Sequence, residues 1–137
     1  MSEKSSFTDL STSEATEVVN EYLTAFYAGE HEVARRLVSE DFAFRGPFLE
    51  VAGAKAFFDG AAGLQTMVRG HRPLGQWQRG RDVSTLYEVK LKTPAAAGSV
   101  LMSERNLVSE GRVTSGLVVF DTAAFRALVP QAGTGAS

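Results

Sequence analysis

Apolar positions in the first half of the chain recur at the spacing of helices. A helix is expected over 13–28, and Gly29 is placed to end it in a left-handed conformation. A shorter helix and a third one over 54–62 are expected to follow. The residues expected on the buried faces of these helices are Ala15, Val18, Val19, Tyr22 and Phe26, then Val33, Ala34, Leu37 and Val38, then Ala54, Phe57, Phe58 and Ala61.

Alternation of apolar and polar residues predicts strands in the second half. A short strand is already expected over 42–45, ended by Gly46-Pro47 because proline cannot donate to a strand ladder. The further strands are expected over 66–71, 74–79, 82–93, 100–109 and 113–121. The residues of the clearest inward face are Val83, Thr85, Tyr87, Val89 and Leu91. A tight connection over 109–112 predicts a hairpin, and Asp121 or Thr122 is expected to cap a last helical turn.

Helices followed by long antiparallel strands predict an α+β fold. We expect a strongly bent antiparallel sheet that wraps around the N-terminal helices and leaves an inner pocket. The expected organisation is a flexible lead-in over 1–12, a single domain over 13–129 and a disordered tail over 130–137.

Composition narrows the class of function. The 137 residues are 44% hydrophobic and include nine phenylalanines, which suits one core, while the absence of cysteine excludes disulfides and thiolate metal sites. A formal net charge of -2 argues against nucleic-acid binding. No signal-peptide pattern or membrane-length apolar run is recognisable, so we expect a cytoplasmic protein that binds no membrane. His31 and His71 lack metal-ligand spacing and no Gly-rich phosphate loop is present, so we expect no metal and no cofactor.

Three stretches of the chain carry a resemblance to a known family. VVNEYLTAFYAGEHEVARRLVSEDFAFRGPF, VAGAKAFF and a strand-rich half ending in SERNLVSEGRVTSGLVVFD resemble the SnoaL-like and ketosteroid-isomerase-like branch of the nuclear transport factor 2-like superfamily. The resemblance implies a cone-like α+β barrel with a deep pocket, and a homodimer. Members include isomerases, polyketide cyclases, epoxide hydrolases and plain binding proteins, so the resemblance implies a fold and leaves the chemistry open.

The resemblance carries over to the site only in part. Tyr22 falls where ketosteroid isomerases have the tyrosine of their oxyanion hole, and Glu104 falls near their protonated aspartic acid. Their catalytic aspartate precedes a proline, whereas Gly46 precedes Pro47 here. Because this departure removes the family's general base, we expect steroid isomerisation to be undetectable.

The residues themselves leave two interpretations open for each catalytic candidate. Tyr22 is either a core tyrosine or a hydrogen-bond donor at the floor of a pocket. Glu104 shares a strand face with Asn106, and that face is either a pocket wall, where burial would raise the pKa of Glu104 and suit it to acid or base catalysis, or a solvent or interface surface. His71 is either a general base or a structural residue.

The ligand-binding candidates have the same ambiguity. Arg45 would anchor an anionic or carbonyl group or lie on the surface, and Trp77 would stack on a ligand or seal a dimer. The full set of expected ligand-binding residues is Arg45, Trp77, Asn106, Phe26, Phe44, Phe58, Tyr87 and Met102.

Three functions compete on these grounds. The first is a cofactor-free acid/base enzyme of the isomerase, cyclase or epoxide-hydrolase type, acting on a small apolar carbonyl, polyketide-like or epoxide compound. The second is a non-catalytic module that binds a ligand, and the third is a dimerisation module. The expected partners are a small apolar or amphipathic molecule and a second copy of the chain.

Overall fold

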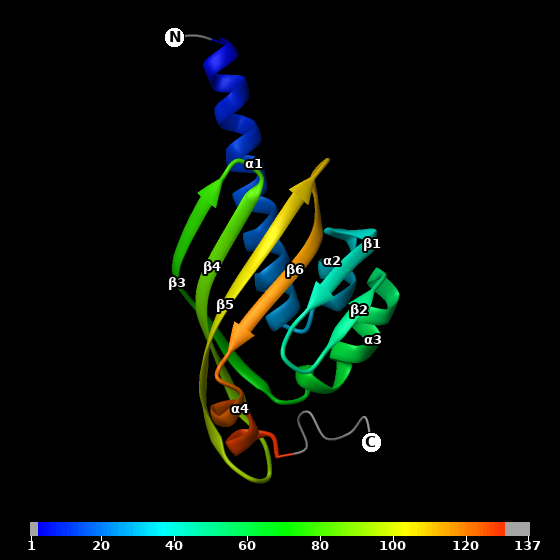
Figure 1. The fold of residues 1–137 in the computed structure, drawn as a ribbon, viewed down its shortest axis with the longest axis vertical. Coiled ribbons are helices and arrows are strands. Elements are labelled where there is room, and N and C mark those ends of the chain that lie inside the picture. The colour runs from blue at the N-terminus through cyan, green and yellow to red at the C-terminus, as the bar shows by residue number, and fades with distance from the viewer. Residues whose placement is uncertain (1–2, 131–137) are drawn as a thin grey trace.

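The computed structural model describes the backbone of residues 3–130 and the side chains of residues 14–130. Four helices and six strands follow one another in it (Figure 1). In chain order these are α1 (Glu3–Tyr27), α2 (His31–Arg36), β1 (Val38–Arg45), β2 (Glu50–Ala52), α3 (Ala54–Gln65), β3 (Val68–Arg79), β4 (Asp82–Lys92), β5 (Ala97–Ser109), β6 (Arg112–Phe120) and α4 (Thr122–Leu128). The arrangement is α+β, as the sequence predicts.

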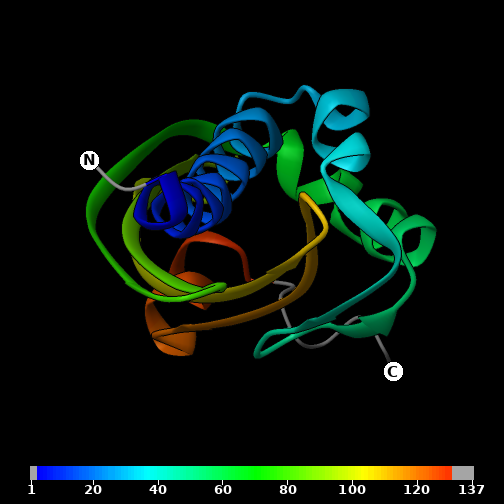
Figure 2. The same ribbon diagram turned by 90° about the horizontal axis from the view of Figure 1, so that it is seen from above.

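The strands form one mixed sheet in the order β2-β1-β6-β5-β4-β3. All neighbours are antiparallel except β1 and β6, which run parallel. The sheet curves around α1, but β2 and β3 remain at separate edges (Figure 2). The expectation of a wholly antiparallel sheet closed into a barrel is therefore wrong on both counts. A short hairpin imposes an antiparallel pair, whereas no turn fixes the direction of β1 relative to a strand so far along the chain.

Several boundaries also differ from the sequence-based expectation. Helix α1 begins at Glu3 instead of residue 13, and Val38 opens β1 instead of lying on a helix. Val33, expected to be buried, is 39% exposed. The two strands expected around Pro73 are one strand, β3, with an irregular register between Pro73 and Gly75. An edge strand tolerates proline because one of its sides needs no ladder partner. Residues 1–2 and 131–137 lie outside the described part of the chain.

The core lies between the concave face of the sheet and the helices. The inward faces expected for α1, α3 and β4 are confirmed as buried. Phe57 of α3 stands at the centre of an aromatic cluster, with ring centroids 5.0 Å from Phe42, 4.7 Å from Phe44 and 5.6 Å from Phe26. Asp121 caps α4 as expected, since its carboxylate accepts from two backbone N–H groups at the start of the helix. The aromatic cluster packs α1, α3 and β1 together.

Two further features of the described residues bear on the kind of protein. No helix among them is both long and apolar enough to cross a membrane. Nor do three His, Cys, Asp or Glu side chains within them gather where they would hold a metal ion.

Candidate functional site

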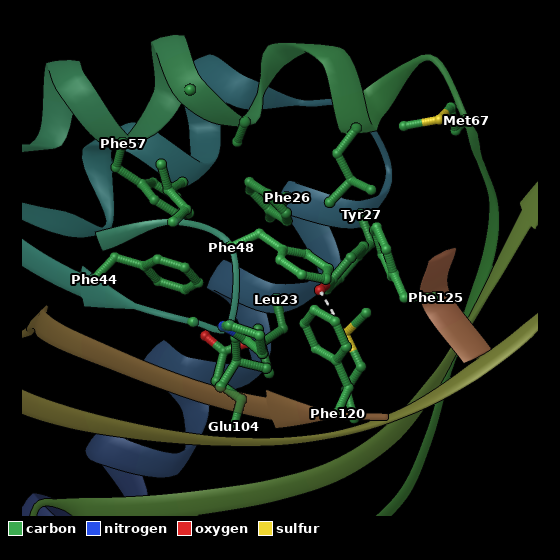
Figure 3. A pocket seen from close by; sticks show the side chains of 18 of the residues that line it. Leu23, Phe26, Tyr27, Phe44, Phe48, Phe57, Met67, Glu104, Phe120 and Phe125 are labelled. Atoms are coloured by element: carbon green, nitrogen blue, oxygen red, sulfur yellow. Dashed lines mark hydrogen bonds between the residues drawn. The ribbon is translucent and has the colours of Figure 1, made fainter. Parts of the chain in front are cut away.

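A cavity of about 240 Å³ lies between the concave face of the sheet and helices α1 and α3 (Figure 3). Its walls come from α1, β1, the β1–β2 loop, α3, the α3–β3 connection, β5, β6 and α4. Most lining residues are aromatic or aliphatic, and the lining side chains that carry an oxygen are those of Tyr22, Tyr27 and Glu104. At roughly 30 Å³ for each water in the liquid, the space is that of about eight water molecules. It suits a small and largely apolar molecule.

Exposure of the lining residues distinguishes a floor from a mouth. Tyr22 and Leu23 of α1, with Glu104 of β5, are at most 3% exposed and form the closed end. Pro47 of the β1–β2 loop and Gly60 of α3 are exposed and border the open end. A ligand entering at the mouth therefore passes through an apolar passage before it reaches the polar groups.

Glu104 is held from both sides by protein donors. The Tyr87 hydroxyl donates to Oε1 over 2.6 Å, and Nδ2 of Asn106 donates to Oε2 over 3.2 Å. Burial raises the pKa of Glu104, and these two hydrogen bonds oppose the rise. The carboxyl is thus a buried acid whose negative form still has two donors to stabilise it.

Space for this arrangement depends on a glycine of the neighbouring strand. Gly116 of β6 lies opposite Asn106 in the sheet. A Cβ atom there would stand 3.4 Å from Glu104 Oε2, 3.3 Å from Asn106 Nδ2 and 3.1 Å from Phe44 Cδ1. Asn106 is fixed in turn because its Nδ2 also donates to the backbone carbonyl of Ser115 over 3.2 Å.

Tyr22 brings a second polar group to the same floor. It lies on the buried stripe of α1 and is 1% exposed. No hydrogen bond joins its hydroxyl to another group in the described part of the chain. Burial raises the pKa of Tyr22, and the nearby Glu104 and Tyr27 raise it further. Its phenol stays neutral and available as a donor to a ligand.

Tyr27 of α1 extends the series of hydrogen bonds that begins at Glu104 and Tyr87. Its hydroxyl lies 2.9 Å from that of Tyr87 and 3.9 Å from the sulfur of Met102. When Tyr87 donates to Glu104, its single proton is used, so Tyr27 must donate to Tyr87. Burial, followed by the charge of Glu104, raises the pKa of Tyr27 well above its ordinary value.

Comparison with solved structures places this architecture among known folds. An NTF2-like protein of unknown function from Burkholderia pseudomallei has a TM-score of 0.76 at 14% identity, over 85% of this chain and 97% of that one. The chain has the NTF2-like fold. The sequence resemblance to proteins of this fold is therefore confirmed, although the sheet is mixed and is not closed into the expected barrel.

Two other similar structures with this fold have names that suggest different chemistries. An LEH-like epoxide hydrolase from M. tuberculosis has a TM-score of 0.74 at 19% identity, over 87% of this chain and 92% of that one. A putative polyketide cyclase from Xanthomonas campestris pv. campestris has a TM-score of 0.74 at 17% identity, over 87% and 98%. No protein-family model and no curated protein matches the chain. The structural similarity establishes the NTF2-like fold. Because the sequence identities are this low, the comparisons do not establish which reaction, if any, the protein catalyses, and that question depends on the residues of the site.

The structure brings some of the sequence-predicted site residues together at the NTF2-like cavity. Tyr22, Glu104, Phe26, Phe44 and Met102 line it. Their convergence supports the interpretation of the strand face around Glu104 as a pocket wall.

Asn106 and Tyr87 do not line the cavity, but both donate to Glu104 from behind. Phe58 packs behind the lining residues Phe26 and Phe57, with ring centroids 6.3 Å and 5.0 Å away. These three candidates pack behind the cavity wall and would not contact a ligand in the cavity.

The remaining three candidates lie away from the cavity. His71 is separated from it by Tyr27, whose ring stacks on the imidazole at 4.7 Å. Arg45 is exposed on β1, and Trp77 is 62% exposed on β3. The structure thus does not bring them to the floor that Tyr22 and Glu104 share.

Sequence reasoning missed several lining residues. Tyr27 follows Phe26 directly and so falls off the apolar stripe of α1, and its polar link to Tyr87 is a tertiary contact. Phe48 sits in the β1–β2 loop and Phe125 in α4, where their rings meet at 5.7 Å beside the cavity. No periodic signal marks a loop aromatic, so only the fold could identify them. Leu23 lies beside Tyr22, where the helical pattern favours burial without indicating a cavity.

Proposed function

We propose that this protein binds a small, largely apolar carbonyl compound and moves a proton on it with Glu104, without a cofactor. The observation that carries the proposal is the pairing of a buried carboxyl with an unengaged tyrosine hydroxyl at the floor of an apolar cavity. Tyr22 would donate a hydrogen bond to the carbonyl oxygen, and Glu104 would face the adjacent carbon.

The proposed reaction is a proton shuttle. The carboxylate of Glu104 takes a proton from the carbon next to the carbonyl, and the electron pair of that C–H bond moves toward the oxygen, which becomes an enolate held by Tyr22. The same carboxyl then delivers a proton to carbon. If its proton has first exchanged with solvent, delivery to the original carbon gives hydrogen exchange, and delivery to a conjugated carbon gives isomerisation. Burial supports this role because the raised pKa of Glu104 makes its ionised form a stronger base.

The polar groups of the cavity favour this reaction over the opening of an epoxide. Epoxide opening by water needs a base for the water and an acid for the ring oxygen. Glu104 is the one carboxyl among the described residues that line the cavity, His71 stands behind Tyr27, and the raised pKa of Tyr22 makes its phenol a weak acid for the ring oxygen. A shuttle needs only one group that accepts and returns a proton.

A hydrogen-exchange assay with 2-indanone tests the proposal. In D₂O, NMR should show that the protein accelerates loss of the protons next to the carbonyl. Glu104→Gln preserves the shape of the side chain but removes the base, so the acceleration should fall by about 10²–10⁴. Tyr22→Phe removes the donor to the enolate and should lower the rate by about 10²–10³.

Glu21→Gln provides the matched control because Glu21 is the exposed neighbour of Tyr22 on α1. Its exchange rate should equal that of the unmodified protein. An acceleration that persists in Glu104→Gln would overturn the proposal. Binding of 2-indanone without any exchange would also overturn the catalytic role and would favour the alternative of a non-catalytic binding module.

A further inference from the structure

A second cavity of about 290 Å³ lies between α1 and β3, and it is partly open to solvent because Asn20, Thr24, Pro73 and Leu74 in its lining are exposed. We call the first cavity, described above, the front chamber and this one the rear chamber. The residues that line the rear chamber are Asn20, Leu23 and Thr24 of α1, His71, Pro73, Leu74, Gly75 and Gln76 of β3, and Thr85 of β4. Strands β3 and β4 curve around α1 on this side (Figure 2).

One side chain belongs to both chambers. Leu23 lines the floor of the front chamber and also lines the rear chamber, and it is only 2% exposed. Beside it the wall is an aromatic pair, with Tyr27 facing the front chamber and His71 facing the rear. Their rings stack 4.7 Å apart with an interplanar angle of 17°. Leu23 is therefore the residue that the linings of the two chambers have in common, and it lies next to a stacked pair that has one ring in each lining.

The two chambers differ in chemistry. The front chamber is apolar apart from its tyrosines and Glu104, whereas the rear one combines apolar residues such as Pro73 and Leu74 with the amide and hydroxyl groups of Asn20, Thr24, Gln76 and Thr85. In the rear chamber Nε2 of Gln76 donates to Oδ1 of Asn20 over 2.7 Å and to the hydroxyl of Thr85 over 3.1 Å. A molecule extending from front to rear would meet hydrocarbon first and hydrogen-bonding groups at its far end.

We infer that Leu23 is a specificity-determining residue that limits the length of the ligand by closing the front chamber against the rear one. The inference rests on the proposed function only in taking the front chamber as the ligand site. With Leu23 in place, a ligand ends at the floor beside Tyr22 and Glu104. A shorter side chain at this position would join the chambers and admit elongated amphipathic molecules, whose tail would extend between α1 and β3.

Alkylbenzenes test this without involving the chemistry of Glu104, because they carry no oxygen. Isothermal titration calorimetry would compare toluene with n-hexylbenzene for the unmodified protein and for Leu23→Ala. Each methylene that leaves water adds to affinity, so burying two or more of them in the rear chamber should raise the affinity ratio of n-hexylbenzene to toluene at least tenfold.

Two control variants separate the effect of Leu23 from general effects on the core. Leu23→Met conserves volume and should leave the ratio as it is in the unmodified protein. Leu91→Ala removes the same atoms from a leucine that is 1% exposed and lines neither chamber, so the ratio should again be unchanged.

A ratio in folded Leu23→Ala within twofold of the unmodified protein would overturn the inference. If Leu23→Ala does not fold, Leu23→Val serves in its place. For Leu23→Val, an affinity ratio raised less than threefold would overturn the inference. Failure of the proposed function appears elsewhere, as 2-indanone exchange that does not depend on Glu104. The two failures are therefore distinguishable.

Discussion

Replacing Glu104 with glutamine should make the stability difference between variant and unmodified protein depend on pH. Burial raises the pKa of Glu104 above its ordinary value of 4.5, so the folded protein holds this proton more tightly than the unfolded chain. The tighter binding of this proton stabilises the folded protein. The stabilisation is complete below pH 4.5 and is lost as the pH rises from there to the pKa of Glu104 in the folded state. Within that window the unmodified protein loses about 1.4 kcal/mol per pH unit, whereas glutamine does not titrate.

A second, pH-independent contribution follows from the partners of Glu104. Glutamine keeps an oxygen to accept from Tyr87, but its amide nitrogen then faces Nδ2 of Asn106. Asn106 cannot turn its oxygen forward without losing its bond to Ser115. Two facing donors leave one unsatisfied, at about 1–3 kcal/mol. Glu104→Gln should therefore be less stable by about that amount below pH 4.5, and the deficit should shrink or reverse as the pH rises.

Urea unfolding followed by far-UV circular dichroism between pH 3.5 and 8 measures this difference. Burial lowers the pKa of His31 and of His71, which reduces stability as the pH falls, but these contributions are common to both proteins and cancel on subtraction. The free energy of unfolding of Glu21→Gln should change with pH as that of the unmodified protein does, over the whole range. A difference between Glu104→Gln and the unmodified protein that is flat above pH 4.5, or that grows in favour of the unmodified protein, would refute the reasoning.

Three further predictions concern packing and assembly. Phe57→Ala should lower the free energy of unfolding by about 3–5 kcal/mol in urea denaturation, because the aromatic cluster closes around its ring. Gly116→Ala should destabilise by about 1–3 kcal/mol through crowding of Phe44 and Asn106, whereas Gly63→Ala in α3, where nothing lies within 4 Å of the added atom, should be neutral or slightly stabilising in the same assay. The homodimer stays a prediction: light scattering should give twice the chain mass at micromolar concentration, and a monomer mass would contradict it.

Local pattern determined much of the fold. The alternation along β4 predicts its buried face because successive side chains of a strand point to opposite sides whatever the partner strand is. The helical spacing in α3 similarly predicts its buried face, including Phe57 and Phe58. Both patterns depend on the backbone period of a single element, which neighbouring residues encode.

The site depended on the sequence for its residue types and on the fold for its arrangement. Tyr22 and Glu104 could be named as candidates from the sequence, because Tyr22 lies on the apolar stripe of its helix and Glu104 shares a strand face with Asn106, but the sequence left a core tyrosine and a solvent-facing strand equally open. The arrangement of these two residues at one floor, the hydrogen bond from Tyr87 to Glu104 and the position of Tyr27 between the cavity and His71 are contacts between different elements, which the pattern of a single element does not encode.

Tertiary structure alone decided strand direction and the extent of the cavity. The parallel pairing of β1 with β6 joins strands that are far apart in the chain and that no turn links, so no local pattern fixes its direction. The lining aromatics Phe48 and Phe125 come from a loop and a short helix, whose position depends on packing that no period reports. The volume of the cavity, and the presence of Leu23 in the linings of both chambers, depend on the placement of every element, because a cavity is a property of packing between elements and not of any one of them.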